Sequence, residues 1–111
     1  HVALEAAEAV AKRGIEVEIV DLRTILPFDA ETCVDSVRRT GRLIVLQEAQ
    51  YTGGLGHTVS SRILEEAFWN LENAPVVIGA LDTPVPFSPP LEDHTIPSSD
   101  YVVRHIRRMC E

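Results

Sequence analysis

Two ionisable side chains flank a short glycine-rich stretch near the middle of the chain. Glu48 follows an apolar run, and His57 comes after Gly53, Gly54 and Gly56. A carboxylate and an imidazole are common partners in general acid–base catalysis. Glycines that precede a helix also allow its first backbone amides to approach an anion such as a phosphate group. These five residues therefore form a candidate site, either for acid–base chemistry or for binding an anion.

The glycine stretch does not match the established phosphate-binding motifs. Counted from Gly54, a G-x-G-x-x-G fingerprint requires a third glycine where Val59 stands, and no Gly-Lys-Ser/Thr follows. The alternative is that the glycines only let a strand turn into a helix, and that His57 caps or solvates the loop. The sequence favours this alternative, because no nucleophile with the required partners accompanies Glu48 and His57.

The element that positions these residues is a strand, glycine loop and helix unit within residues 42–73. The run from Leu43 to Leu46 is wholly apolar, as in a strand that is covered on both faces. After the glycines, Val59, Ile63 and Ala67 recur at helical spacing. In open α/β sheets ligands bind at the carboxyl ends of the strands, which is where Glu48 stands.

Two aromatic residues follow this helical stripe. We expect Phe68 to pack in the core. Trp69 lies off the main apolar stripe, and the pattern leaves it equally open to core packing or to a contact surface.

The remaining elements alternate helices and strands. Asp29 is placed to cap a second helix, and Gly14 and Gly41 stand where left-handed caps would end two helices. The expected helices are Val2–Arg13, Ala30–Thr40 and a last one from Ser98 or Ser99 to Cys110; the other expected strands are Glu16–Leu22 and Val76–Leu81. This order predicts a mostly parallel α/β sheet with right-handed crossovers.

Residues 82–98 form a different kind of segment. They contain five prolines, which exclude regular structure and favour a stiff, extended path over the surface. Loops of this length are more often functional or interfacial than idle. We therefore expect the loop to pack across the domain and Phe87 to be buried at an inter-subunit surface.

The composition limits the partners and the compartment. The length of 111 residues indicates one domain. The formal net charge of −7 argues against a surface that binds nucleic acid or an anionic membrane. An acidic surface suits a basic protein partner instead. Cys33 and Cys110 fit no metal-ligand spacing and are too few for a disulfide framework, so a reducing interior is expected. No apolar run approaches the ~20 residues of a membrane span.

Three stretches carry a resemblance to a known family. They are VDLRTILPFDAETCVDSVRRTGRLIVLQEAQYTGGLG (20–56), NLENAPVVIGALDTPVPFSPPLED (70–93) and TIPSSD (95–100). In this order and with matching gaps, they resemble the carboxyl-terminal domain of the β subunit of thiamine-diphosphate-dependent 2-oxoacid dehydrogenases. These are the decarboxylating components of the pyruvate, branched-chain 2-oxoacid and acetoin dehydrogenase complexes. The resemblance implies one transketolase C-terminal-type domain over 1–111, a three-layer α/β/α fold with a mostly parallel open sheet.

The resemblance also implies where the chemistry lies. In this family thiamine diphosphate and the glutamate that activates it belong to other domains and to the α subunit. We therefore expect no catalytic, cofactor-binding or metal-binding residue on this chain, with thiamine diphosphate and Mg²⁺ held in the whole enzyme. The competing hypothesis is a free-standing anion- or phosphate-binding enzyme that uses Glu48, Gly54 and His57.

The expected partners follow from the same resemblance. The domain would hold β subunits together in an α2β2 assembly and contact the peripheral-subunit-binding domain of the acyltransferase core, a small basic module. The whole enzyme would decarboxylate a 2-oxoacid oxidatively and pass the acyl group to lipoyl groups, in a bacterial cytoplasm or a mitochondrial matrix. The partner-binding residues expected on this chain are Glu72, Phe87 and Glu111.

The topology carries one further prediction. Val2–Arg13 is a crossover helix, and a parallel unit needs a strand at each end of its helix. The resemblance implies that the fold's first strands are missing, one of them from between Val17–Val20 and Leu43–Leu46. We therefore expect no ladder between these two runs and a parallel ladder between Leu43–Leu46 and Val76–Leu81.

Overall fold

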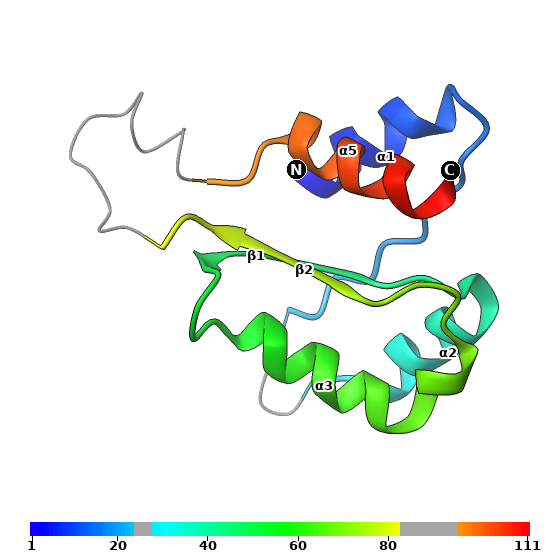
Figure 1. Cartoon of the computed structure of the whole chain (residues 1–111), viewed down its shortest axis with the longest axis vertical. Coiled ribbons are helices and arrows are strands. Elements are labelled where there is room, and N and C mark those ends of the chain that lie inside the picture. Colours follow the sequence, from blue (N-terminus) through cyan, green and yellow to red (C-terminus); the bar gives the residue numbers. More distant parts are fainter. Residues whose placement is uncertain (24–27, 83–95) are drawn as a thin grey trace.

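The computed structural model describes residues 1–23, 28–82 and 96–111, and Figure 1 shows their arrangement. The predicted burial of Phe87 lies outside the described residues. The elements, in chain order, are α1 (Val2–Ala11), α2 (Ala30–Thr40), β1 (Ile44–Gln50), α3 (Leu55–Ala67), the 3₁₀-helix η1 (Phe68–Asn70), β2 (Val76–Ala80) and α5 (Ser99–Cys110).

The described strands form a two-stranded parallel sheet. Ile44 pairs with Val76 and Leu46 with Ile78, and an irregularity follows before Gln50 pairs with Ala80. This ladder confirms the predicted parallel pairing of the two apolar runs. Helices α1 and α5 cover one face of the sheet, and α2 and α3 cover the other (Figure 1). The result is the expected three-layer α/β/α arrangement, with a narrow sheet.

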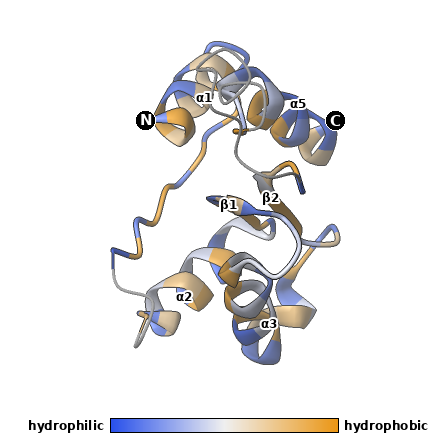
Figure 2. Ribbon diagram, turned by 90° about the vertical axis from the view of Figure 1, so that its left-hand side faces the viewer, coloured by the Kyte–Doolittle hydropathy of each residue, from blue (hydrophilic) through white to orange (hydrophobic). Residues whose placement is uncertain are grey.

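Each face of the sheet has its own apolar core. The core on the α2–α3 side is built from Cys33, Val34, Val37, Val59, Ile63 and Ala67, and the core on the α1–α5 side from Ala6, Val10, Ile78, Val102 and Ile106. Both pairs of helices therefore contribute apolar residues to a core, and Figure 2 colours the ribbon by residue hydropathy. The two cores keep the sheet between them and fix the direction of both strands.

The predicted strand Glu16–Leu22 is wrong, because these residues form no helix or strand. Strand structure needs a ladder partner, and within the described residues β1 pairs only with β2. Figure 2 shows the segment crossing from the α1 layer to the α2 layer away from the sheet. Val17 and Ile19 are left 38% and 40% exposed. The absence of a ladder between Val17–Val20 and Leu43–Leu46 was predicted and is confirmed.

α2 and α5 use predicted caps, whereas the C-cap of α1 is Lys12, and Gly14 lies beyond it with a φ of 82°. Asp29 accepts hydrogen bonds from the backbone N–H of Thr32 (3.1 Å) and from its hydroxyl (2.6 Å). Gly41 ends α2 in the left-handed region with φ of 77°, and Ser98 caps α5 by accepting from the N–H of Tyr101. α1 ends at Ala11, two residues earlier than predicted. Among the described residues, no helix has the length and apolar character needed to span a bilayer.

Candidate functional site

The glycine loop is organised around a side chain that the sequence reasoning missed. Gln47, near the carboxyl end of β1, donates from Nε2 to the carbonyl oxygen of Gln50 (2.9 Å). Its Oε1 accepts from the backbone N–H of Gly56 (2.6 Å). One amide group therefore joins the strand end to the first turn of α3. The only sequence signal was a polar residue directly after an apolar strand.

The glycines beside Gln47 are required by its side chain. A Cβ at Gly54 would overlap the Gln47 amide, and one at Gly56 would lie 2.5 Å from Gln47 Oε1. Both Cβ positions are too close to Gln47 for a real contact, so a larger residue at position 54 or 56 would displace the Gln47 side-chain amide. Gly53 has a φ of 76° and makes the turn itself. Two of the three glycines thus accommodate a side chain, and the third serves the backbone.

This arrangement affects the proposed anion site. α3 begins at Leu55, and the unbonded amides of a helix's first turn are the groups that bind anions. One of them, the N–H of Gly56, is already bonded to Gln47. The Gly56 N–H is therefore not free to bind an anion in this arrangement. Glu48 is exposed at the end of the strand.

His57 is held against the loop that precedes it. Its Nε2 donates to the carbonyl oxygen of Tyr51 (2.9 Å), and its ring meets the Tyr51 ring edge-on with centroids 4.6 Å apart. Beside it, the Asp82 carboxylate accepts from the N–H of Thr52 (2.8 Å) and from the Thr52 hydroxyl. These two hydrogen bonds, joined by the nearby charge of His57, lower the pKa of Asp82. The contacts fasten the carboxyl ends of β1 and β2 to each other, and the acid–base role of Glu48 and His57 stays a prediction.

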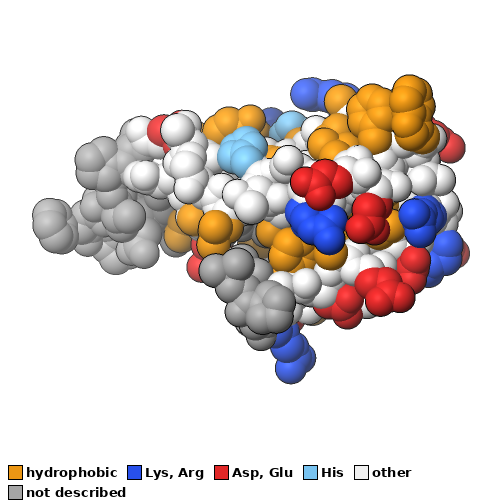
Figure 3. Space-filling model, turned by 90° about the horizontal axis from the view of Figure 1, so that it is seen from below, with side chains coloured by type: hydrophobic (Ala, Val, Ile, Leu, Met, Phe, Trp, Pro, Cys, Tyr) orange, Lys and Arg blue, Asp and Glu red, His pale blue; other side chains and the backbone are white. Residues whose placement is uncertain are grey.

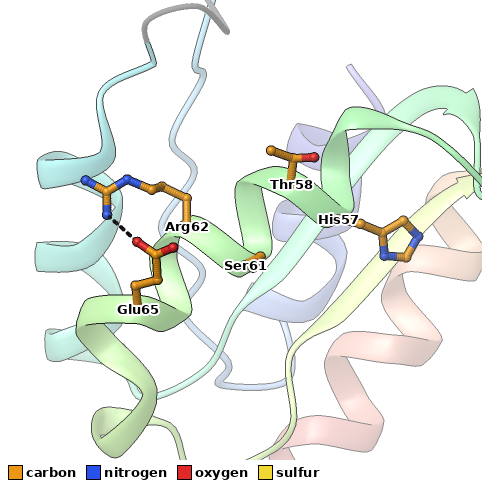
Figure 4. Close-up of a pocket in the computed structure, with 5 residues that line it drawn as sticks. All are labelled: His57, Thr58, Ser61, Arg62 and Glu65. Carbon is orange, nitrogen blue, oxygen red and sulfur yellow. Dashed lines mark hydrogen bonds and ion pairs between the residues drawn. The ribbon is translucent and has the colours of Figure 1, made fainter.

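An open hollow lies on the outer face of α3 (Figure 4). Arg62 forms ion pairs with Glu65 and Glu66, both at 3.3 Å. His57 points away from Arg62 and Glu65 in this view, so these groups do not converge on a common point. The lining residues are His57, Thr58, Ser61, Arg62 and Glu65.

The structure brings two predicted partner-binding residues to one corner of the molecule. Arg42, just before β1, donates from Nε to the carbonyl oxygen of Met109 near the end of α5 (2.9 Å). The same guanidinium forms an ion pair with Glu72 (2.9 Å), whose side chain is 61% exposed. Glu111, two residues beyond Met109, pairs with Arg107 at 3.3 Å. Arg42 therefore holds Glu72 beside the carboxyl end of α5.

An aromatic pair stands at the end of α3. Phe68 is 56% exposed and Trp69 is 92% exposed, and their rings meet edge-on with centroids 5.0 Å apart. The predicted core position of Phe68 is therefore wrong. α3 ends at Ala67 and continues as the tighter η1 turn, so the helical stripe no longer points Phe68 inward. For Trp69, the contact-surface alternative agrees with its exposure.

The parallel strands with paired helices on either face define an α/β domain. Comparison with known families shows the family to which this domain belongs. Residues 1–102 match the family described as transketolase, C-terminal domain, and the chain belongs to this family.

Several curated relatives are β subunits. The chain is 44% identical to the β subunit of acetoin:2,6-dichlorophenolindophenol oxidoreductase from Cupriavidus necator, over 97% of this chain and 32% of that protein. It is 35% identical to the pyruvate dehydrogenase E1 component subunit beta of Rickettsia bellii, over 97% of this chain and 33% of that protein. The mitochondrial pyruvate dehydrogenase E1 component subunit beta of Pisum sativum is 37% identical, over 97% of this chain and 30% of that protein. The chain thus spans about a third of the length of these relatives.

A solved structure supports the fold. It is described as a split-gene transketolase, an inactive β4 tetramer, with a TM-score of 0.72 and 28% identity. The match covers 97% of this chain and 34% of that one. The family, the relatives and the three layers agree with the resemblance drawn from the sequence.

Proposed function

We propose that this chain is an assembly and docking domain of the β subunit of a 2-oxoacid dehydrogenase decarboxylating component, and that it does not catalyse alone. The supporting observation is its similarity to acetoin and pyruvate dehydrogenase β subunits, of which it spans about a third. The family match with transketolase C-terminal domains agrees with this assignment. The whole enzyme would decarboxylate a 2-oxoacid oxidatively and transfer the acyl group to lipoyl groups.

The proposed partners are an α subunit, a second β subunit in an α2β2 assembly, and the peripheral-subunit-binding domain of the acyltransferase core. The net charge of −7 supports a basic docking partner through electrostatic complementarity. The exposed carboxylates Glu72 and Glu111 lie toward the same end of the molecule and are the proposed contacts. The compartment would be a bacterial cytoplasm or a mitochondrial matrix.

Thiamine diphosphate and Mg²⁺ are proposed to bind elsewhere in the whole enzyme. Among residues 1–23, 28–82 and 96–111, no group of three or more His, Cys, Asp or Glu side chains could hold a metal ion. The N–H of Gly56, in the first turn of α3, is engaged by Gln47. The proposal assigns no catalytic step to the described residues.

Calorimetric titration of the isolated chain separates this proposal from a free-standing anion-binding enzyme. We expect no heat of binding from thiamine diphosphate or inorganic phosphate. Micromolar binding of either would contradict the proposal and favour the site of Glu48, Gly54 and His57. A His57→Ala variant is then the matched test, since binding that uses this imidazole should be lost.

The docking half of the proposal has its own test in the whole β subunit. Glu72→Gln and Glu111→Gln should each weaken binding to the isolated peripheral-subunit-binding domain several-fold, because each removes a carboxylate that faces a basic module. Surface plasmon resonance at two salt concentrations measures the effect. Glu8→Gln, an exposed carboxylate on α1, is the matched control. Equal affinity in all three variants would exclude this corner as the docking contact.

A further inference from the structure

The outward side of α5 carries a row of aromatic and basic side chains. The inward side of the helix buries Val102, Ile106 and Met109. Side chains three or four residues apart are neighbours on a helix surface, and four such neighbours stand beside the buried stripe. We name these four residues the α5 row: Tyr101, Arg104, His105 and Arg108. Three of them are exposed and the histidine is half-buried, so the row is open to a partner on the outer helix layer (Figure 1).

The side chains of the α5 row hold one another in place. The guanidinium carbon of Arg104 lies over the Tyr101 ring, 5.4 Å from its centroid. The same ring meets the His105 ring edge-on, with centroids 4.8 Å apart. The N–H of Tyr101 donates to the Ser98 hydroxyl (3.2 Å), which fixes the first turn of the helix. Because these contacts exist before a partner arrives, binding costs little side-chain entropy.

Most cations of the chain are paired with carboxylates, and those that are not lie in one layer. Six of the ten Lys and Arg side chains form ion pairs. Figure 3 views the molecule from the α2–α3 side and shows cationic and anionic side chains next to one another, as Arg62 is with Glu65 and Glu66. Within residues 1–23, 28–82 and 96–111, four cations form no ion pair, and all of them lie on α5 or directly after α1: Lys12, Arg13, Arg104 and Arg108.

The two arginines of the α5 row have no carboxylate partner in the described part of the chain, although acidic residues stand at helical spacing from them. Asp100 is four residues before Arg104, and Glu111 is three residues after Arg108. Arg104 lies over an aromatic ring instead, and Glu111 pairs with Arg107 at 3.3 Å. Basic residues in a last turn stabilise the negative end of a helix, which accounts for Arg107 and Arg108 but not for Arg104. The row therefore carries cationic charge that helix stability does not require.

The spacing and the type of these groups select an acidic, extended partner. Arg104 and Arg108 are four residues apart, which corresponds to about 6 Å along a helix axis. Side chains on one side of an extended segment repeat every two residues, at about 6.6 Å. Guanidinium groups bind carboxylates through two parallel hydrogen bonds, and Arg and Tyr are among the residue types enriched at binding hot spots. The net charge of −7 repels a long polyanion such as nucleic acid and so favours a short acidic protein segment.

We propose that the α5 row of Tyr101, Arg104, His105 and Arg108 is a docking surface for an acidic, extended segment of a partner protein. Each arginine binds one of two carboxylates at alternate positions of that segment, and the Tyr101 ring holds Arg104 in position for the first of them. This surface goes beyond the proposed function, because the docking partner proposed there is basic and its contacts on this chain are carboxylates.

The first test measures binding of a defined acidic peptide. A fluorescently labelled peptide of alternating aspartate and alanine is titrated into the 111-residue chain, and its anisotropy is recorded. We expect saturable binding that weakens as salt is added, because the charges are exposed. The same peptide with asparagine in place of aspartate is the control and should not bind. No binding of the aspartate peptide, or equal binding of the asparagine peptide, would overturn the proposal. Equally tight binding of a single-stranded DNA of the same charge would overturn the choice of a protein segment.

Variants of the arginines locate the peptide on the chain. Arg104→Gln and Arg108→Gln should each weaken binding of the aspartate peptide about two- to fivefold, the loss expected for one exposed ion pair. Arg38→Gln is the matched control, because it removes the same charge from an exposed side chain on α2, and its affinity should equal that of the wild type. An equal loss in all three variants would show that net charge alone attracts the peptide. Unchanged affinity in both α5 variants would reject the row as the docking surface.

His105 reports binding without any substitution. Burial, followed by the charges of Arg108 and Arg104, lowers the pKa of His105 below its ordinary value. Carboxylates bound to these arginines offset their charge, so saturating aspartate peptide should raise the His105 pKa, as measured by NMR titration of the imidazole protons. His57, on α3 at the other face of the sheet, is the internal control and should not change. A His105 pKa that stays the same at saturating peptide would contradict the proposal.

Discussion

The side-chain amide of Gln47 restricts which residues can stand in the loop that follows β1. Its two hydrogen bonds join Gln50 to Gly56, and the glycines at 54 and 56 leave the space that it fills. The sequence predicted a turn at these glycines and offered an anion site as the functional hypothesis. It could not predict the amide's position, because the hydrogen bonds join groups up to nine residues apart through a loop whose path depends on the fold.

Replacement of Gln47 by alanine should destabilise the domain by about 1–3 kcal/mol, because it leaves a partly buried N–H and a carbonyl without their partner. Glu48→Gln is the control, since an exposed neighbour should change the free energy of unfolding by less than about 0.5 kcal/mol. Urea denaturation followed by circular dichroism gives both values. Equal midpoints for the two variants would show that the loop does not depend on Gln47.

The elements divide into those that local pattern determines and those that need partners. α2 was predicted from Ala30 to Thr40 and has these bounds, because Asp29 and Gly41 supply local start and stop signals. The segment Glu16–Leu22 has an equally good strand pattern and is not a strand, because a ladder partner is required. The predicted core position of Phe68 was wrong for a related reason. The helical period that placed its side chain inward ends one residue earlier, at Ala67.

The two strands are also linked by a contact that depends on pH. The Thr52 hydroxyl and N–H lower the pKa of Asp82 below its ordinary value of 3.8. Below 3.8 the unfolded state therefore binds more protons than the folded state, so this stabilisation is present above that pH and is lost as the pH falls through the folded pKa. Thr52→Val should return the Asp82 pKa toward 3.8, as measured by NMR titration of its carboxyl carbon. An unchanged pKa in that variant would show that Thr52 is not the cause.

At the scale of the whole molecule, β1 has one edge paired with β2 and, within residues 1–23, 28–82 and 96–111, no strand on its other edge. The N–H of Val76 donates to the carbonyl oxygen of Leu43, so in a parallel ladder the backbone groups of Val45 face β2 and those of Ile44 and Leu46 face away. Open strand edges pair readily with other chains. The family resemblance predicted this gap, whereas the strand pattern alone did not.

Amide hydrogen exchange measures the difference between the two edges of β1 for each residue. The amides of Ile44 and Leu46 should exchange much faster than that of Val45 in the same strand, because only Val45 donates to a ladder partner. NMR of the isolated chain in D₂O gives the rates, with Val45 as the internal control. Equal protection of all three amides would mean that a second strand lies on this edge.

The pairing of α1 with α5 has a consequence for the order of folding. Val10 and Ile106 belong to one apolar core although they are separated by almost the whole chain. Closing a loop of roughly 95 residues costs about 4 kcal/mol of chain entropy, about 1 kcal/mol more than the roughly 30-residue closure that pairs β1 with β2. We therefore expect the α2–β2 unit to form early and the helix pair to join it late. Until it does, the Ile78 side of the sheet faces water, and this interval is when newly made chains are most exposed to aggregation.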